Sequence, residues 1–302
     1  MSQNLQITAF HHPGSSTFSY VVWDPESRHA AVIDSVLHYE AVSGRTSAHY
    51  LDQIVGFVHD HELQTDWVLE THAHADHVSG GALVKRALGG NTAIGAGIRD
   101  VQKHFGAAYG LERDFTPDGS QFDHLFEDGE SFTVGTIQAR AIATPGHTPD
   151  HMTYLIGDAA FVGDSLFMPD SGTARCDFPG GDAATLYRSI QRLFELPDET
   201  RLFVLHDYAP GGREYRNETT IGAERADNIH VGGGRSGADF VKLRNARDAT
   251  LGMPALIIPA IQVNIRAGEL PPEDASGRRY LKTPLDRASD FSTVAGTAPP
   301  TP

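Results

Sequence analysis

The sequence predicts a mixed α/β fold in which two packed sheets are covered by helices. Two observations indicate this fold: strand-like segments occur in both halves of the chain, and helical segments follow them in each half. The composition agrees, because 40% of the 302 residues are hydrophobic and 21% are charged, as in ordinary globular proteins. A chain of this length can bury a substantial core as one or two domains.

In the first half, apolar runs predict strands and one apolar stripe predicts a helix. Leu51, Ile54 and Val58 fall at i, i+3 and i+7, which indicates a helix over 50–63 with one buried face. The other elements expected here are paired strands in the first 35 residues, a buried strand over 66–71 and a helix over 78–88. The irregular stretch 103–130 predicts either a loop that covers a functional site or a surface excursion.

The second half repeats the alternation of strands and helices. Asp182 is a suitable N-cap for a helix that ends before Pro197. The other expected elements are strands over 131–143, 152–156, 160–162 and 202–205, and helices over 218–229 and 239–247. We expect one main domain over 1–270 and a partly flexible C-terminal extension over 271–302, which is rich in Pro, Ala, Ser and Thr.

Charge and composition exclude several classes of partner. With 24 Lys and Arg against 39 Asp and Glu, the net charge of −15 disfavours nucleic acid and anionic membranes. No apolar run reaches the ~18 residues of a membrane span. The single cysteine cannot form an internal disulfide, and residues 1–4 do not resemble the start of a signal peptide. We therefore expect a cytoplasmic protein that acts on a small molecule, with a homodimer as the candidate assembly.

Side chains of the kind that bind metals follow the ends of four predicted strands. They are His72, His74, Asp76 and His77, then His147, then Asp164, and then His206. Alternate residues of an extended segment point the same way, so His72 and His74 can face one ion. Asp76 and His77, where a helix is expected to begin, can face a neighbouring position. A lone histidine is usually an ordinary surface or hydrogen-bonded residue, so the others, His151 included, receive no role. The joint pattern predicts a metal site.

These residues also carry a resemblance to a known family. The segment 71–77, Thr-His-Ala-His-Ala-Asp-His, resembles the HxHxDH signature of the metallo-β-lactamase superfamily. Gly146–His147, Gly163–Asp164 and His206 follow in the order of the remaining motifs. The resemblance covers about residues 6–210 and implies an αββα sandwich with the metal site at one edge of the two sheets. The superfamily includes hydrolases, nucleases and sulfur oxidases, so the fold alone does not choose the reaction.

Further motifs point to one branch of the superfamily. The segments 144–149, 162–167 and 205–208 look like those of glyoxalase II and the persulfide dioxygenases. The pair Asp177–Phe178 favours the dioxygenases, and the C-terminal part shows no sign of the helical glutathione-binding domain of glyoxalase II. Residues 168–173 depart from the best-known members and suggest a subgroup similar to bacterial β-lactamase hydrolase-like proteins.

The resemblance implies an Fe(II)-dependent persulfide dioxygenase with one iron per chain. Its substrates would be O2 and glutathione persulfide, or a related persulfide, and its products sulfite and the parent thiol. His72, His147 and Asp164 would form a facial triad that leaves the other coordination positions open. His74, Asp76, His77 and His206 would surround the triad and hydrogen-bond its ligands and bound water, with Asp76 and His77 as the catalytic pair.

Two residues are candidate substrate contacts: Arg175 because it lies soon after Asp164, and Tyr208 because it resembles the tyrosine that lines the thiol site in this branch. Arg175 would hold a carboxylate of a glutathione-like thiol, with an ordinary structural ion pair as the alternative. Tyr208 would line the thiol site, with core packing as the alternative. Both remain expectations at this point.

Two other functions remain open. The same donors suit a dinuclear zinc-type hydrolase of thioesters, lactones or lactams that binds one or two Zn(II). In that assignment one ion takes His72, His74 and His147, the other takes Asp76, His77 and His206, and Asp164 bridges them. The third alternative is a non-catalytic metal-binding module, against which the complete donor set argues.

Overall fold

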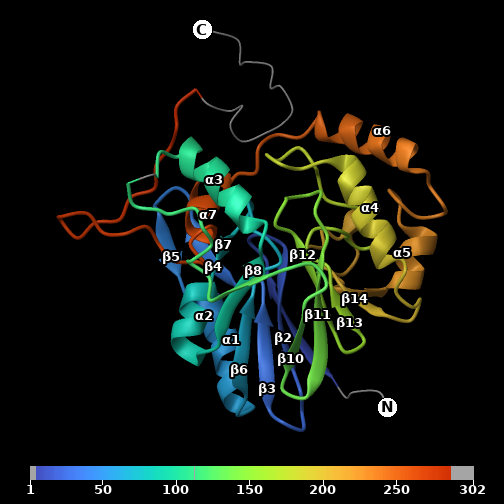
Figure 1. Ribbon diagram of the computed structural model, residues 1–302, viewed down its shortest axis with the longest axis horizontal. Coiled ribbons are helices and arrows are strands. Elements are labelled where there is room, and N and C mark those ends of the chain that lie inside the picture. Colours follow the sequence, from blue (N-terminus) through green and yellow to red (C-terminus); the bar gives the residue numbers. More distant parts are fainter. Residues whose placement is uncertain (1–4, 112, 287–302) are drawn as a thin grey trace.

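Two six-stranded sheets pack face to face in the computed structural model, which describes residues 5–111 and 113–286 (Figure 1). The first sheet has the order β1-β2-β3-β6-β8-β9, with bounds Gln6–His12, Thr17–Trp23, His29–Ile33, Gln64–Leu69, Asn91–Gly95 and His124–Phe126. The second has the order β10-β11-β12-β13-β14-β15, with bounds Ser131–Val134, Ile137–Ala143, Met152–Ile156, Ala159–Phe161, Arg201–Phe203 and Glu218–Thr220.

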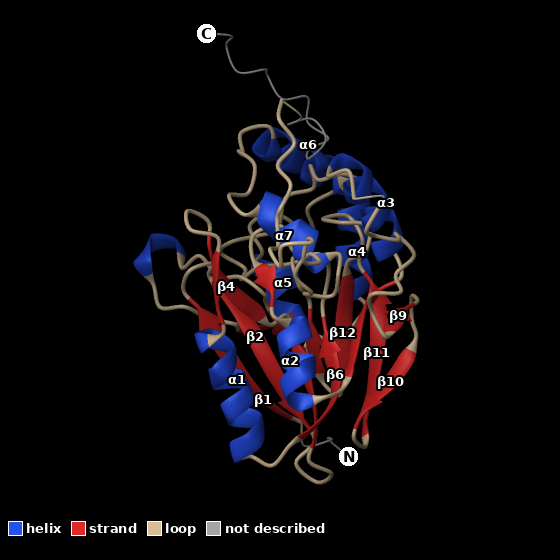
Figure 2. Ribbon diagram, turned by 90° about the vertical axis from the view of Figure 1, so that its left-hand side faces the viewer, coloured by secondary structure: helices blue, strands red, loops and turns tan. Residues whose placement is uncertain are grey.

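Helices cover the outer faces of both sheets, so the layers follow the order αββα (Figure 1), and Figure 2 looks onto the helices that cover the first sheet. The helices are α1 His49–Asp60, α2 Gly81–Leu88, α3 Ile98–Ala108, α4 Ala183–Leu193, α5 Ile221–Asp227, α6 Gly237–Asp248 and α7 Ile257–Asn264, with a short 3₁₀ turn at Pro210–Gly212. A small third sheet joins β5 Arg45–Ser47, β4 Val36–Glu40 and β7 Val78–Ser79. None of the helices in the described residues is long and apolar enough to cross a membrane.

The core between the sheets explains why they stay together. Val22, Ile33 and Leu69 of the first sheet share one buried cluster with Tyr154 and Phe161 of the second. The outer face of the first sheet packs on α1 and α2, whereas that of the second packs on α4, α5 and α6. Alternation along the strands therefore gives each sheet two buried faces, which confirms the predicted layers.

Parallel strand pairs bring distant segments to one edge of the sandwich. β3 and β6 run parallel in the first sheet, as do β13 and β14 in the second. Parallel strands end at the same edge, so the residues after β3 meet those after β6, and the residues after β13 meet those after β14. β12 runs antiparallel to β13, so the loop before β12 joins the same edge. All the predicted metal ligands follow or precede these strand ends.

Several predicted elements were wrong in detail. The helix expected over 78–88 is instead β7 followed by α2, because Val78 and Ser79 pair with β4 before the chain turns at Gly80. The stretch 103–130 is not irregular throughout: α3 reaches Ala108, and β9 lies within it. The helix expected over 218–229 begins only after β15, and α7 was not anticipated. Half of the extension assigned to 271–302, residues 287–302, lies outside the described residues.

Glu224 of α5 makes stability depend on pH. Its side chain is fully buried, and burial raises its pKa to about 8 from the ordinary 4.5. Between these values the folded state binds more protons than the unfolded state, so stability falls as pH rises. We expect this group to contribute a decrease on the order of 1 kcal/mol per pH unit between about pH 5 and pH 8. Denaturant unfolding of the apo-protein should show this contribution as a difference in slope between the original protein and Glu224→Gln; parallel curves would refute the assignment.

Candidate metal centre

The loop after β6 is anchored by buried carboxylates before it presents its histidines. Asp34, directly after β3, accepts the backbone N–H of Thr71 at 2.7 Å and its hydroxyl at 3.0 Å. Asp150 accepts the backbone N–H of Ala73 at 2.7 Å. The loop has no strand ladder of its own, so these side chains supply the contacts that fix it. Asp76 and His77 therefore lie in an anchored loop. The sequence had suggested instead that a helix begins there.

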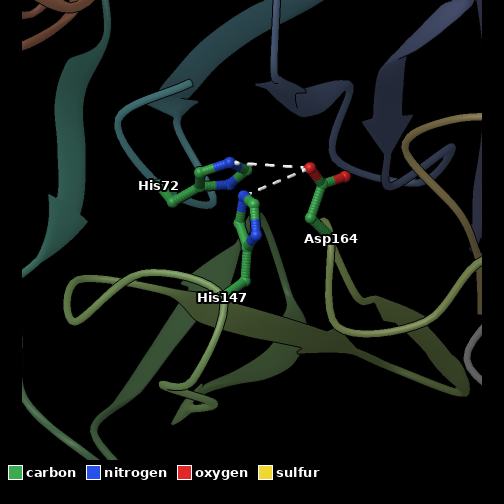
Figure 3. Close-up of side chains that lie close together, drawn as sticks. All are labelled: His72, His147 and Asp164. Atoms are coloured by element: carbon green, nitrogen blue, oxygen red, sulfur yellow. Dashed lines mark ion pairs between the residues drawn. The ribbon is translucent and has the colours of Figure 1, made fainter. Parts of the chain in front are cut away.

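His72, His147 and Asp164 converge from three separate loops (Figure 3). Each can offer one ligand atom, and these atoms lie within 4.8 Å of one another. Oδ2 of Asp164 is 3.9 Å from Nε2 of His72 and 3.5 Å from Nε2 of His147. All three side chains are buried. The structure thus brings together the three residues that the resemblance implied as a triad.

Hydrogen bonds to the far ring nitrogens orient the two imidazoles of the triad. Nδ1 of His147 donates to the backbone carbonyl of Arg175 at 2.6 Å. Nδ1 of His72 lies 3.1 Å from the hydroxyl oxygen of Thr71, whose own proton goes to Asp34. Each Nε2 is then left with its lone pair facing Asp164, which is the tautomer that a metal ligand requires.

A second group stands beside the triad. His74, Asp76 and His77 offer ligand atoms within 4.8 Å of one another. Nε2 of His206 is 3.2 Å from Oδ2 of Asp76 and 3.5 Å from Oδ1 of Asp164. Asp164 therefore lies between the two groups. His74 groups with Asp76 and His77, and not with His72 and His147 as the dinuclear assignment had it.

Buried polar atoms without partners indicate that these groups suit a cation. Six such atoms occur here among the described residues: Nε2 of His72, Nδ1 of His74, both ring nitrogens of His77, Nε2 of His206 and Oδ1 of Asp164. A buried polar atom without a hydrogen bond costs roughly 1–3 kcal/mol, so their concentration at one place needs an explanation. Imidazole nitrogens and carboxylate oxygens are ligands for Fe(II) and Zn(II), and these residues fit either ion.

The electrostatics keep His72 and His77 neutral, which is the form that binds metal. Burial and the neighbouring His74 hold the pKa of His72 well below its usual range, and the same causes lower the pKa of His77. His74 differs, because its Nε2 lies 3.0 Å from Asp34 and 3.1 Å from Glu70. Although burial opposes a charge there, the two carboxylates raise the pKa of His74.

Three residues near the centre were missed by sequence reasoning. His151, which we had treated as an ordinary histidine, accepts the backbone N–H of Asp164 at 2.9 Å and stacks on His72 with ring centroids 4.9 Å apart. Asp34 and Glu70 hold His74. Asp34 and Glu70 directly follow strands β3 and β6, as the predicted ligands follow theirs, so the same criterion applied to the end of every strand would have found them.

A cavity of about 340 Å³ opens onto the triad. His147 and Asp164 line it together with the apolar side chains of Phe167, Phe178 and Leu251. Its volume falls within the range of small-molecule sites, and it combines apolar side chains with a few polar and charged ones, as such sites do. The described residues of 103–130 do not line it, so that stretch is not a cover for this site.

The two predicted substrate contacts both reach the cavity. Tyr208 lines it and stacks on His206 with ring centroids 6.0 Å apart. Arg175 lines it too, but its guanidinium donates to Asp177 at 2.5 and 2.6 Å and to the carbonyl of Gly252 at 2.7 Å. Most of its donors are therefore occupied by a structural ion pair. Contact of either residue with a substrate stays a prediction.

Known proteins resemble this chain in sequence and in structure. The profile of the Metallo-beta-lactamase superfamily matches residues 12–206. A beta-lactamase hydrolase-like protein of Agrobacterium fabrum is 50% identical over 93% of this chain and 64% of its own, longer chain. The mitochondrial persulfide dioxygenase ETHE1 of Homo sapiens is 30% identical over 85% of this chain and 86% of its own. The crystal structure of ETHE1 from Myxococcus xanthus gives a TM-score of 0.70 at 29% identity, covering 87% of this chain and 100% of that one.

Proposed function

Because this chain belongs to the metallo-β-lactamase superfamily, we propose that it is an iron-dependent persulfide dioxygenase. The observation that carries the proposal is the make-up of the converging donors. They are two imidazoles and one carboxylate, His72, His147 and Asp164, whereas His74 groups with Asp76 and His77. A two-histidine, one-carboxylate set is typical of Fe(II) sites that use O2. The likeness to the human persulfide dioxygenase supports the same reaction.

The residues around the triad fit an anionic sulfur substrate. When bound, Fe(II) would supply the redox chemistry by which O2 oxidises sulfur, with open positions for both reactants. Two neutral imidazoles and one carboxylate would leave a net positive charge, which favours a persulfide anion. Arg247 adds a positive charge at the cavity, since it is exposed and has no ion-pair partner among the described residues. The overall reaction converts a persulfide, O2 and water into a thiol and sulfite, with release of protons.

The surrounding side chains would hold substrate and solvent in place. Asp76 and His206 line the cavity beside the triad, where they can hydrogen-bond a bound water. Phe167 and Phe178 keep its walls apolar. Tyr208 stacks on His206 and would contact the thiol part of the substrate. Glutathione persulfide is the substrate we expect, and the cytoplasm is the compartment.

A zinc-type hydrolase is the second candidate, and two observations favour it. The group His74, Asp76 and His77, with His206 close by, could hold a second ion beside the triad. The Agrobacterium fabrum relative, at 50% identity, is named as hydrolase-like. Two ions would activate a water for attack on a thioester, lactone or lactam.

Metal analysis and an oxygen electrode separate the two candidates. Protein purified without O2 should contain about one Fe per chain and consume O2 when glutathione persulfide is added. His77→Ala provides the sharper test. A dioxygenase with iron at the triad should bind iron more weakly in this variant, still reach about one Fe per chain when iron is in excess, and lose roughly 10- to 100-fold in activity, as when a residue around a metal is removed. Two Zn per chain, no O2 uptake and thioester hydrolysis that disappears in His77→Ala would refute the proposal.

A further inference from the structure

Helix α7 sends one side chain into the loop that carries the histidines. Asn264, the last residue of α7, is only 3% exposed. Its Nδ2 donates to the backbone carbonyls of His74 and His77, both at 2.8 Å. Its Oδ1 accepts the backbone N–H of Ser79 at 2.7 Å. Both N–H donors and the carbonyl oxygen of the amide are thus used between His74 and Ser79, from the loop into β7.

The three bonds hold the part of the loop that most needs support. His74 and His77 are the two ends of a four-residue segment with Asp76 inside it, and this segment belongs to no helix or strand. Its side chains form the second donor group. Their direction depends on the peptide planes at the two ends, which Asn264 fixes from outside. An aspartate could not replace it, because a carboxylate would face two carbonyl oxygens.

We propose that Asn264 is a positioning residue of the metal centre, which sets the direction in which His74, Asp76 and His77 present their donor atoms. The positions of the donor atoms must be fixed to within about half an ångström for tight metal binding. Here the support comes from α7, outside the residues 12–206 that match the superfamily profile. The proposal rests on the presence of the metal centre and not on which reaction it performs.

The test is the metal affinity of Asn264→Leu, a substitution close to the asparagine in shape that removes all three hydrogen bonds. We expect the affinity to fall by about 10- to 100-fold, the usual effect of removing a residue that supports metal ligands. The probe is Zn(II) in competition with a chromophoric chelator, repeated with Fe(II) without O2. Asn264→Gln, which keeps the amide, should recover a large part of the affinity.

Gln262 provides a matched control on the same helix. It is also a buried amide, at 1% exposed, and it makes three hydrogen bonds of 2.8–2.9 Å, to Ile258 and Lys282. None of these bonds reaches the metal loop. Gln262→Leu should therefore lower the melting temperature of the apo-protein, as Asn264→Leu does, while its metal affinity stays within about threefold of the original.

The outcomes separate positioning from a general effect on the fold. Unchanged affinity in Asn264→Leu, or equal losses in the two leucine variants, would overturn the proposal. If Asn264→Leu does not fold, Asn264→Ser takes its place in the affinity measurement. If neither folds while Gln262→Leu does, the residue is required by the fold, and the proposal fails. A lack of O2 uptake in the unaltered protein would refute the dioxygenase alone and leave this result standing.

Discussion

Replacement of His147 by alanine should release the bound iron and lower O2 uptake by about 1,000-fold or more. The variant leaves His72 and Asp164 as the only two members of the triad, and a pair of ligands does not hold Fe(II) against solvent. It also leaves the backbone carbonyl of Arg175 without the ring N–H that it accepts at 2.6 Å. Iron content per chain and the initial rate at an oxygen electrode, with glutathione persulfide as substrate, measure the two effects separately.

His29 offers the control for this experiment. It is half-buried and pairs with Asp66 at 2.6 Å, but it starts β3, at the opposite end from the metal loop. His29→Ala should keep both iron and O2 uptake. Full iron occupancy and near-normal uptake in His147→Ala would show that the triad is not the metal site.

Replacement of Asp34 by alanine should cost both stability and metal affinity. The carboxylate is 2% exposed and accepts hydrogen bonds from the N–H and hydroxyl of Thr71 and from His74. Its removal leaves three buried donors without an acceptor. We therefore expect the free energy of unfolding of the apo-protein to fall by about 3 kcal/mol. Metal affinity should fall by roughly 10- to 100-fold as His74 and the loop lose their anchor. Denaturant unfolding and chelator competition measure the two.

Asp24 distinguishes the two consequences. Its carboxylate is 3% exposed and accepts hydrogen bonds from Glu26, Ser27 and Thr136, far along the sheets from the metal loop. Asp24→Ala should therefore destabilise the protein but keep its metal affinity. A loss of affinity in both variants would mean that the metal responds to stability in general and that Asp34 has no special role.

The cluster of candidate metal ligands could be predicted because its members lie at strand ends, and four of them fall within six residues. The spacing of His72, His74, Asp76 and His77 shows directly that several donors leave one strand. His147, Asp164 and His206 each follow a short apolar run, so the same criterion found them. The layered fold followed from the resemblance that these motifs carry, and it is confirmed.

What could not be predicted depends on contacts between distant segments. Nothing near Asn264 in the sequence points to a loop more than 180 residues earlier. The partner of Arg175 is two residues away, yet only the fold shows that the pair leaves its guanidinium little freedom. Nothing in the sequence indicates the role of His151, because this residue acts by accepting the backbone N–H of Asp164, which follows another strand. α3 was missed because the short irregular segments around it hid its Ile98, Val101 and Phe105 stripe.

The placement of the ligands on both sheets has a consequence for biosynthesis. His72 follows β6 of the first sheet, whereas His147 and Asp164 lie beside β12 and β13 of the second sheet. During synthesis, the three candidate ligands are therefore together only after the ribosome has translated Asp164 and the two sheets have packed against each other. We therefore expect metallation to be a late step of maturation. Once acquired, the ion ties the halves together, since a ligand that binds only the native state stabilises it by mass action.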